Sequence, residues 1–236
     1  MVWRAKVDQI TAERGKGANA AEIGERIWLA IAEGRLRPGT RLKEEELAEI
    51  FAVNRARVRQ ALADLSREGL VTIVPNRGAF VAAPSVEEAA DVFYARHAIE
   101  RRVVERLAAA ITPAAVAELR ELIAEERRAS ADSNIPDVIR LSGRFHIRLA
   151  ELVGTDFLAT IMRDLVARSS LITAVYRDTA HFNCGPDEHG AIVDCLARGD
   201  GAGAVEAMGG HLAHLESELH LSPARIGSAD LRSALG

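Results

Sequence analysis

The sequence predicts a mainly α-helical protein in two parts: an N-terminal winged helix-turn-helix, made of three helices and a β-hairpin, and an all-helical bundle of six or seven helices. Three observations lead to this prediction. Aromatic residues make up only 4% of a chain rich in alanine, leucine, glutamate and arginine, a composition typical of helices packed on helices. Strand-like runs are confined to residues 70–82. The segments after residue 85 have helical periodicity.

Charge is distributed unevenly along the 236 residues. Residues 1–83 contain 14 Lys+Arg and 11 Asp+Glu, a net charge of +3, whereas the remainder contains 16 and 23, a net charge of −7. A basic N-terminal third predicts that only this part contacts a polyanion. No apolar run approaches the roughly 18 residues of a membrane span, the N-terminus lacks a signal-peptide pattern, and two cysteines do not make a disulfide scaffold. We therefore expect a cytoplasmic protein with no membrane partner.

The N-terminal domain is expected to span residues 20–83, after a flexible arm at residues 1–19. Ile23, Ile27 and Ile31 recur at helical spacing and predict a first helix that ends near Gly34. A second short helix is expected over residues 44–51 and a third over residues 55–68. Asn54 precedes the third helix and is a candidate N-cap, because its side chain can accept a hydrogen bond from a free backbone N–H.

The third helix has the pattern of a DNA-reading helix. Val58 and Leu62 belong to an apolar face, and Arg55 and Arg59 lie one turn apart on an adjacent face. Arginine's planar fork can bind guanine edges or phosphates, and the small Ala56 permits close approach. A solvated charged face is the alternative for this helix alone.

Two strand-like runs follow, at residues 70–74 and 79–82, and they predict a β-hairpin with Asn76, Arg77 and Gly78 at its tip. An ordinary structural ribbon is the alternative. Because the hairpin directly follows an arginine-bearing helix, we interpret it as a wing that contacts DNA.

Residues 85–221 are expected to form the helical domain, with Ser85 as a cap and Pro113 at a helix start. Residues 222–236 are small and polar and are expected to be a frayed tail. The predicted helices span residues 85–110, 113–130, 135–153, 155–178, 187–198 and 201–221.

The N-terminal third resembles the GntR family of bacterial transcription regulators. The resemblance rests on a dense pattern over about 60 residues: Ile31, Gly34, Leu36, Pro38-Gly39, Leu42, Leu47-Ala48, Val53, Arg55, Val58-Arg59, Ala61-Leu62, Leu65, Glu68-Gly69-Leu70-Val71, Gly78 and Val81. It implies that Arg55 and Arg59 reach bases and phosphates. Asn54 and Ala56 replace the usual hydroxyl residues, which implies fewer phosphate contacts there. Asn76, Arg77 and Gly78 match the wing tip, and Arg41 and Lys43 are candidates for further backbone contacts.

The remainder resembles the FadR-type C-terminal domain called FCD, through Arg96 and Glu100, Phe145-His146, Glu188-His189 and Met208-Gly209-Gly210-His211. In many relatives this domain holds a divalent metal through an aspartate, a histidine four residues later and two further histidines. The resemblance maps the histidines to His146, His189 and His211 and places Ser142 at the aspartate position. Serine is a poorer ligand than a carboxylate for zinc, nickel or manganese, so a metal site here is expected to be weakened. The alternatives are a histidine-lined polar pocket without metal and direct binding of an anionic ligand by the histidines.

The resemblance further implies that the pocket binds a small organic acid. Arg96 is the candidate for binding the carboxylate of this acid with two hydrogen bonds. The alternative is a structural ion pair between Arg96 and Glu100, one turn away. His214 could substitute as a ligand but is expected at the surface. His97, His181 and His220 have no matched partner.

We therefore expect a ligand-responsive regulator and not an enzyme. A homodimer would present two reading helices to a short inverted repeat of double-stranded DNA. Two alternatives remain open at this point: a metalloenzyme that uses the three histidines, and a DNA binder whose pocket is vestigial.

Overall fold

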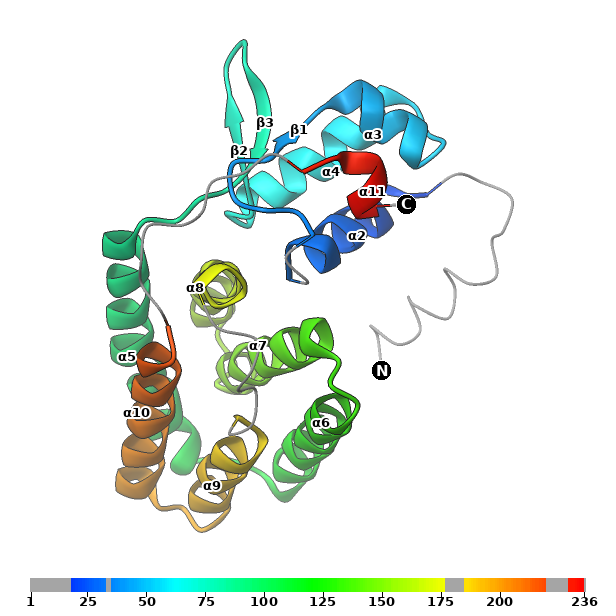
Figure 1. Cartoon of the computed structure of the whole chain (residues 1–236). Coiled ribbons are helices and arrows are strands. Elements are labelled where there is room, and N and C mark those ends of the chain that lie inside the picture. The colour runs from blue at the N-terminus through cyan, green and yellow to red at the C-terminus, as the bar shows by residue number, and fades with distance from the viewer. Residues whose placement is uncertain (1–17, 33–34, 177–184, 220–228, 236) are drawn as a thin grey trace.

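The isoleucines of the N-terminal third form the buried face of the first described helix, α2 (Ala20–Ala32). In this computed structural model the described residues are 18–32, 35–176, 185–219 and 229–235. Residues 1–17 of the arm expected over residues 1–19, the stop at Gly34 and the histidines His181 and His220 lie outside these ranges. Figure 1 shows α2 in a small N-terminal domain that lies above a set of longer helices.

The helix that the sequence predicts to contact DNA begins at the expected residue, Arg55. Helix α3 (Glu44–Ile50) is followed by α4 (Arg55–Arg67), and Asn54 caps α4 by accepting a hydrogen bond from the backbone N–H of Arg57 at 2.9 Å. The chain leaves α4 through Gly69, whose φ of 76° lies in the left-handed region that glycine adopts without strain. Helices α2, α3 and α4 share one hydrophobic core that includes Ile23, Leu47 and Leu62.

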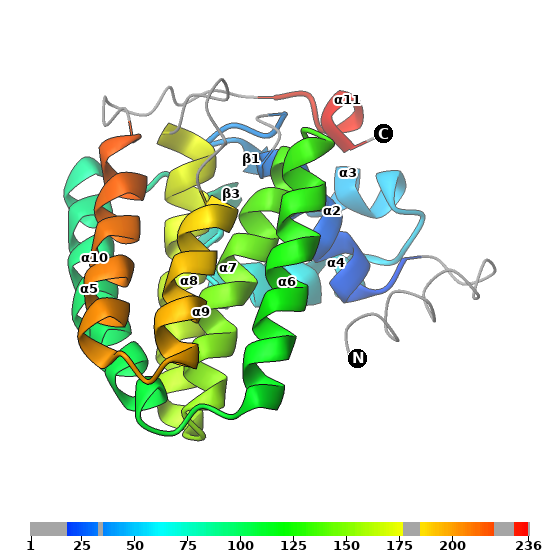
Figure 2. The ribbon, with the colours of Figure 1, turned by 90° about the horizontal axis from the view of Figure 1, so that it is seen from below.

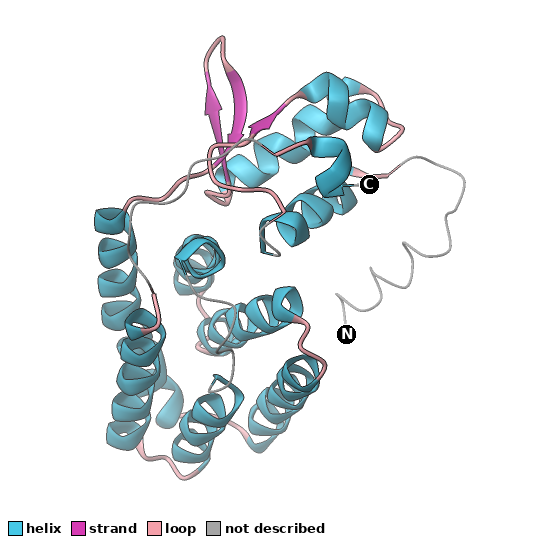
Figure 3. Cartoon of the chain, in the orientation of Figure 1, coloured by secondary structure: helices cyan, strands magenta, loops and turns pink. Residues whose placement is uncertain are grey.

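The predicted hairpin is strands β2 (Val71–Val74) and β3 (Gly78–Val81), which pair antiparallel with Val71 opposite Val81. A third strand, β1 (Arg41–Leu42), was not predicted because two residues are too short for a recognisable alternation. It pairs with the other side of β3, with Arg41 opposite Phe80. In the described residues strands occur only in this domain, and the hairpin projects away from the helical bundle (Figure 3).

Six long helices form the second domain, as predicted, with ends that differ by a few residues. Ser85 caps the first by accepting from the backbone N–H of Glu88 at 3.1 Å. Figure 2 shows these helices side by side with their axes roughly aligned. They are α5 (Val86–Ala108), α6 (Pro113–Ala131), α7 (Ile135–Leu152), α8 (Asp156–Tyr176), α9 (Gly185–Ala197) and α10 (Gly201–Ser217).

Helix α8 joins the two domains. Its Leu171 is buried in the core of the N-terminal domain, and its Met162 and Val166 are buried in the core of the helical domain. Arg168 forms an ion pair with Glu88 of α5 at 3.0 Å. One rigid helix is therefore packed into both cores.

The C-terminal residues differ from the expected frayed tail. Residues 222–228 lie outside the described ranges, but Leu231–Leu235 form helix α11, which lies on the N-terminal domain beside α2 and α3 (Figure 1). Leu231 and Leu235 are buried in that core, and Arg26 donates to the carbonyl oxygen of Leu235. Two leucines four residues apart are enough to bind one helical turn to the domain. Their spacing was the available signal in the sequence, but the segment is otherwise small and polar.

Candidate functional site

The exposed side of α4 carries the arginines predicted to contact DNA. The side chains of Arg55 and Arg59 are 54% and 65% exposed, and the spacing of four puts them on one face. Ala56 is also exposed. Arg57 differs from them, because its Nη1 donates to the carbonyl oxygen of Ala18 at 3.2 Å. The structure thus presents Arg55 and Arg59 together to solvent.

Two glutamates at the start of α3 bind these arginines. The sequence did not predict these contacts. Glu44 accepts from Nε and Nη2 of Arg59 at 3.1 and 2.8 Å. Arg55 donates from Nη1 to Glu45 Oε1 at 2.7 Å, and its Nη2 lies 3.5 Å from Glu44 Oε2. The hydrogen bond from Arg59 is the main cause that lowers the pKa of the Glu44 carboxyl. The run of three acids at residues 44–46 was the available signal, but spacing alone does not pair each acid with an arginine.

The wing tip gathers the remaining predicted DNA contacts. Asn76 and Gly78 have positive φ values of 60° and 99°, the backbone geometry that asparagine and glycine tolerate in tight turns. Strand β1 brings Arg41 close: a Cβ added to Gly78 would lie 3.6 Å from Arg41 Nε. The guanidinium of Arg77 lies 5.9 Å from the ring centre of Phe80. Arg41 and Arg77 therefore belong to one basic group at the hairpin.

Three histidines from three helices meet inside the helical domain. His146 of α7, His189 of α9 and His211 of α10 are at most 2% exposed. The Nε2 atom of His211 lies 3.2 Å from Nε2 of His189 and 3.2 Å from Nε2 of His146. Phe145 stacks on the His189 ring with 4.1 Å between centroids. The three rings thus point their Nε2 atoms at one point.

Each ring is oriented from behind by a glutamate. The sequence offers Glu100 only as a possible partner of Arg96 and does not predict the contacts of the three glutamates with the histidines. Contacts of this kind fix the tautomer and leave the Nε2 lone pair facing the centre. The three hydrogen bonds join His146 Nδ1 to Glu100 Oε2 at 2.5 Å, His189 Nδ1 to Glu126 Oε2 at 2.7 Å, and His211 Nδ1 to Glu188 Oε2 at 2.7 Å.

Burial controls the charges of this cluster. It lowers the pKa of His146 to about 3 and that of His189 well below its usual value, so both rings are neutral at neutral pH. Burial alone would raise the pKa of the Glu100 carboxyl, but Arg96 and His146 outweigh it and hold the pKa at about 2. Neutral imidazoles backed by an ionised carboxylate are the form in which histidine binds metals.

The donor set fits a divalent metal. The ligand atoms of the three histidines lie within 4.8 Å of one another. Tetrahedral zinc with Zn–N bonds of about 2.0–2.1 Å would separate its ligand nitrogens by roughly 3.3 Å, close to the two Nε2 separations of 3.2 Å. Three histidines with an open position are a known catalytic and binding arrangement of zinc. The residues present are therefore compatible with a metal, even with serine at position 142.

A cavity of about 50 Å³ reaches the cluster at His146, and Ser142, Ser169 and Thr173 are among the other side chains that line it. Two buried polar atoms at this cavity, Nη2 of Arg96 and Oε1 of Glu126, have no hydrogen-bond partner in the described part of the chain. Burial raises the pKa of the Glu126 carboxyl to about 8. A buried polar atom without a hydrogen-bond partner is costly, so these two atoms are the unsatisfied part of the cavity wall.

Arg96 has the structural role that was one of the two interpretations left open by the sequence. Its Nε donates to Glu100 at 2.7 Å and its Nη1 donates to Ser169 of α8 at 3.1 Å, which is the structural role. Its Nη2 remains at the cavity, where it can bind a ligand. One guanidinium therefore binds Ser169 of α8 and Glu100, the carboxylate that orients His146, and it lines the cavity.

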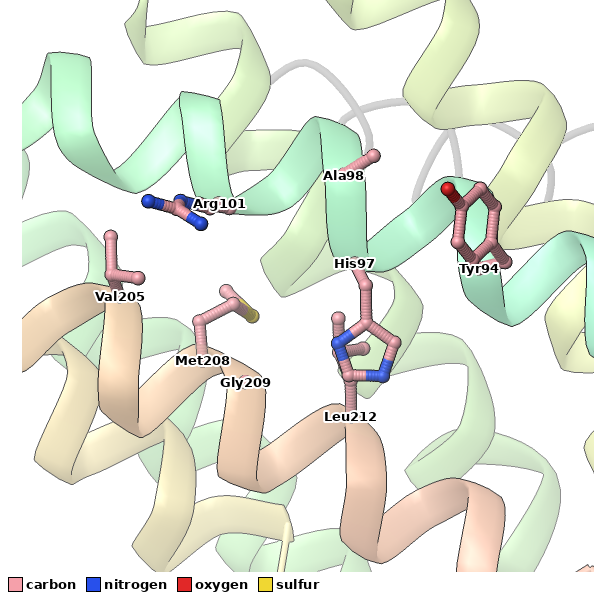
Figure 4. Close-up of a pocket in the computed structure, with 8 residues that line it drawn as sticks. All are labelled: Tyr94, His97, Ala98, Arg101, Val205, Met208, Gly209 and Leu212. Atoms are coloured by element: carbon pink, nitrogen blue, oxygen red, sulfur yellow. The ribbon is translucent and has the colours of Figure 1, made fainter.

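A second hollow, of about 370 Å³, lies between α5 and α10 (Figure 4). Small and apolar residues such as Ala98, Gly209 and Leu212 line it. Tyr94 lies at its rim in Figure 4 and is 80% exposed. His97 also lines it and lies 3.9 Å from Glu216. This hollow has no cluster of ligand-type side chains like that of the histidine site.

His214 is half-buried and contacts Glu188, with 2.6 Å from Nδ1 to Oε1. It therefore shares the glutamate that orients His211 and is not one of the three clustered rings.

No described helix is long and apolar enough to cross a membrane.

Protein-family models match both domains. The model described as "Bacterial regulatory proteins, gntR family" matches residues 19–81, and the model described as "FCD domain" matches residues 91–214, more than half of the chain. This chain belongs to the GntR family and carries an FCD domain. These matches confirm the family resemblance that was based on the sequence motifs. The fold class of the regulator is also the predicted one.

Two curated relatives cover most of the regulator. It is 32% identical over 205 residues to an uncharacterised HTH-type transcriptional regulator in an unstable DNA locus of Streptomyces ambofaciens, covering 85% of each chain. It is 28% identical over 187 residues to the HTH-type transcriptional repressor RspR of Escherichia coli K12, covering 77% of this chain and 80% of the relative.

A solved structure of a putative GntR transcriptional regulator from Rhodococcus sp. RHA1 is 28% identical to the regulator. The match has a TM-score of 0.67 and covers 84% of this chain and 95% of that one. The matched families and relatives describe transcription regulators and give no support to the metalloenzyme alternative.

Proposed function

We propose that this regulator binds a short inverted DNA repeat as a homodimer, and that a small carboxylate held in the helical domain changes its affinity for that DNA. The observation that carries the proposal is the cavity at His146, which is also lined by Arg96 and Glu126; their Nη2 and Oε1 atoms have no hydrogen-bond partner among the described residues. A regulator of this kind works at the chromosome, in the cytoplasm, and not as an enzyme.

The DNA contacts are assigned to two places in the N-terminal domain. Arg55 and Arg59 lie in the major groove, beside Ala56 and the capping Asn54, and bind bases and phosphates. The wing residues Asn76, Arg77 and Gly78, together with Arg41, bind the backbone. The net charge of +3 over residues 1–83 supports this assignment, because phosphate contacts dominate affinity for DNA.

The histidine cluster is proposed to hold one divalent cation, zinc, nickel or manganese, through Nε2 of His146, His189 and His211. A bound metal supplies a positive charge that attracts a carboxylate oxygen of the ligand. The glutamates behind the rings keep the Nε2 lone pairs directed at it. Ser142 lines the same cavity and contributes a hydroxyl where relatives carry an aspartate.

Arg96 is proposed to receive the other carboxylate oxygen through its open Nη2, a charge-assisted hydrogen bond. The cavity, about 50 Å³, is much smaller than the roughly 300–1,000 Å³ of pockets that hold drug-sized ligands. The effector class that fits is therefore a short organic acid, with a hydroxyl or a similar polar group facing Glu126 Oε1.

Coupling to DNA is proposed to run through α8. Ser169 of α8 accepts a hydrogen bond from Arg96 at 3.1 Å, and Leu171, two residues further along, is buried in the core of the N-terminal domain. A ligand that moves Arg96 therefore acts on a helix that both domains share, the physical link that allosteric coupling requires.

The homodimer is proposed to form through the face of α5 and α10 shown in Figure 4. An exposed tyrosine beside a hollow lined by small and apolar residues can complement itself across a two-fold axis, the usual symmetry of dimers.

The test combines thermal unfolding with DNA binding. Purified protein is screened against short-chain hydroxy and keto acids with and without a chelator, and each hit is assayed by fluorescence anisotropy on duplex DNA from the regulator's own promoter region. An acid that shifts both the melting temperature and the DNA affinity supports the proposal. Promoter binding that no acid changes would support the vestigial pocket instead, and no preference for the promoter over random DNA would remove the DNA-binding assignment.

A further inference from the structure

The two reading arginines are held along different edges of their guanidinium groups. A guanidinium has a side edge, formed by Nε and Nη2, and an end edge, formed by Nη1 and Nη2. Glu44 takes the side edge of Arg59, through Nε at 3.1 Å and Nη2 at 2.8 Å. Glu45 and Glu44 instead face the end edge of Arg55, at 2.7 Å from Nη1 and 3.5 Å from Nη2.

This difference decides which donors remain available. In the described residues Arg59 makes no hydrogen bond through Nη1, and its Nη2 keeps a second hydrogen because Glu44 uses only one. The end edge of Arg59 is therefore open, and that edge can match the O6 and N7 acceptors of guanine. The end edge of Arg55 is occupied by carboxylates.

We propose that Glu44 is a positioning residue, which holds Arg59 in the orientation for two hydrogen bonds to a guanine. Glu45 instead occupies the donors of Arg55 in the free protein. When DNA binds, Arg55 leaves Glu45 and contacts a DNA group. The inference rests on the proposed DNA contacts of Arg55 and Arg59 and adds a division of labour between them.

Two physical arguments support this division. An arginine side chain loses conformational entropy when it is fixed, and a two-pronged contact with the partly covered Glu44, 28% exposed, removes part of that freedom before DNA binds. Glu45 is 75% exposed, and exposed single ion pairs contribute little to stability. The Arg55–Glu45 contact is therefore cheap to exchange, while the Arg59–Glu44 contact can persist in the complex.

The test uses full-length protein and a duplex library with a randomised centre. Selection with the wild type yields a preferred duplex, and anisotropy at one fixed salt concentration then measures the affinity for this duplex and for each of its single-base variants. The variants compared are Arg59→Ala, Glu44→Gln and Glu45→Gln. Glu46→Gln is the matched control, because Glu46 lies on the same helical turn but pairs with Lys43 at 3.4 Å.

Arg59→Ala first identifies the base pair that Arg59 reads, as the position where discrimination is lost. Glu44→Gln is expected to lose about tenfold of the discrimination at that same position. Glu46→Gln is expected to leave the discrimination unchanged, although both variants remove one negative charge near DNA. Glu45→Gln is expected to strengthen binding to all duplexes severalfold more than Glu46→Gln does, because it unmasks Arg55.

The outcomes separate this inference from the function on which it rests. If Arg59→Ala changes no base preference, the proposed contact of Arg59 is wrong and the positioning role falls with it. If Arg59→Ala abolishes discrimination at one position while Glu44→Gln keeps the wild-type preference there, only the positioning role of Glu44 is overturned. If Glu45→Gln and Glu46→Gln strengthen binding equally, the masking of Arg55 is overturned.

Discussion

The hydroxyl of Tyr176 donates a hydrogen bond to the carbonyl oxygen of Pro84 at 2.6 Å. Pro84 lies in the short linker between the two domains, and Tyr176 is the last residue of α8, so the bond ties the linker to the helix that packs into both cores. Tyr176 is itself buried. The bond therefore lies at the end of the α8 path proposed for coupling.

Tyr176→Phe is expected to loosen this connection while keeping the ring in place. A buried carbonyl oxygen loses its partner, which costs about 1–3 kcal/mol and lowers the melting temperature by several degrees. We also expect faster proteolysis of the linker near Pro84 and a smaller effect of the effector on DNA affinity. Limited proteolysis and anisotropy measure these changes. An unchanged response to the effector would place the coupling elsewhere.

Ser142→Asp is expected to strengthen metal binding. It places a carboxylate one helical turn before His146, at the edge of the cavity, and an anionic ligand improves a site of neutral imidazoles. Zinc affinity from competition with a chromophoric chelator should rise about tenfold or more, in the range seen when the surroundings of a metal site change. His189→Ala should abolish binding, and His214→Ala, outside the three-ring cluster, should not. Equal zinc content in wild type and His189→Ala would contradict the site.

Arg96→Lys is expected to abolish the response to the effector while the protein still folds. Lysine keeps a positive charge beside Glu100 but cannot contact Glu100, Ser169 and a ligand at the same time. Arg96→Met should instead destabilise the fold by about 3–5 kcal/mol, because it removes one partner of a buried charge. Chemical denaturation separates the two effects. Arg102→Lys, on the exposed side of α5 and outside both cavities, is the control that should change neither property.

Leu231→Ala is expected to lower the stability of the N-terminal domain by about 2 kcal/mol or more, because Leu231 is 2% exposed in that core. Hydrogen exchange should rise in α2 and α3, against which α11 packs, and not in α6. Arg232→Ala serves as the comparison: it removes only an exposed ion pair with Glu49, worth at most about 1 kcal/mol. Equal protection in α2 for wild type and Leu231→Ala would show that the C-terminal helix does not support this domain.

Tyr94→Glu is expected to weaken the homodimer, since it would place two like charges at an apolar contact between copies. Light scattering during size-exclusion chromatography should report a lower mass at the same protein concentration, with an unchanged circular dichroism spectrum. Binding to a duplex with two half-sites should fall more than binding to one half-site. Phe157→Glu, another exposed aromatic on the first turn of α8, is the control. A dimer that withstands Tyr94→Glu would move the contact to another face.

The sequence predicted the helices of both domains within a few residues, because the signals that define them are local. Isoleucines at helical spacing mark α2, Asn54 and Ser85 cap the helices that follow them, and an Asn-Arg-Gly tip closes the hairpin. The sequence missed β1 and the docking of α11, since a two-residue strand and a single helical turn exist only through their neighbours.

The histidine cluster likewise combines residues that the sequence identified with partners that it did not. Residue types and motif matches were enough to select His146, His189, His211 and Arg96. The partners Glu126 and Glu188 lie 63 and 23 residues from the histidines they orient, and no periodicity relates positions on different helices.

The sequence by itself therefore determined which elements form, which family the chain belongs to and which side chains are chemically capable of binding DNA or a metal. Only the tertiary structure decided that Glu44 supports Arg59 from the side, that Arg96 keeps one nitrogen open at the cavity, and that α8 enters both cores. The physical reason is that caps and periodicity act within a few residues, whereas the choice of a partner among several acids depends on how separate helices pack.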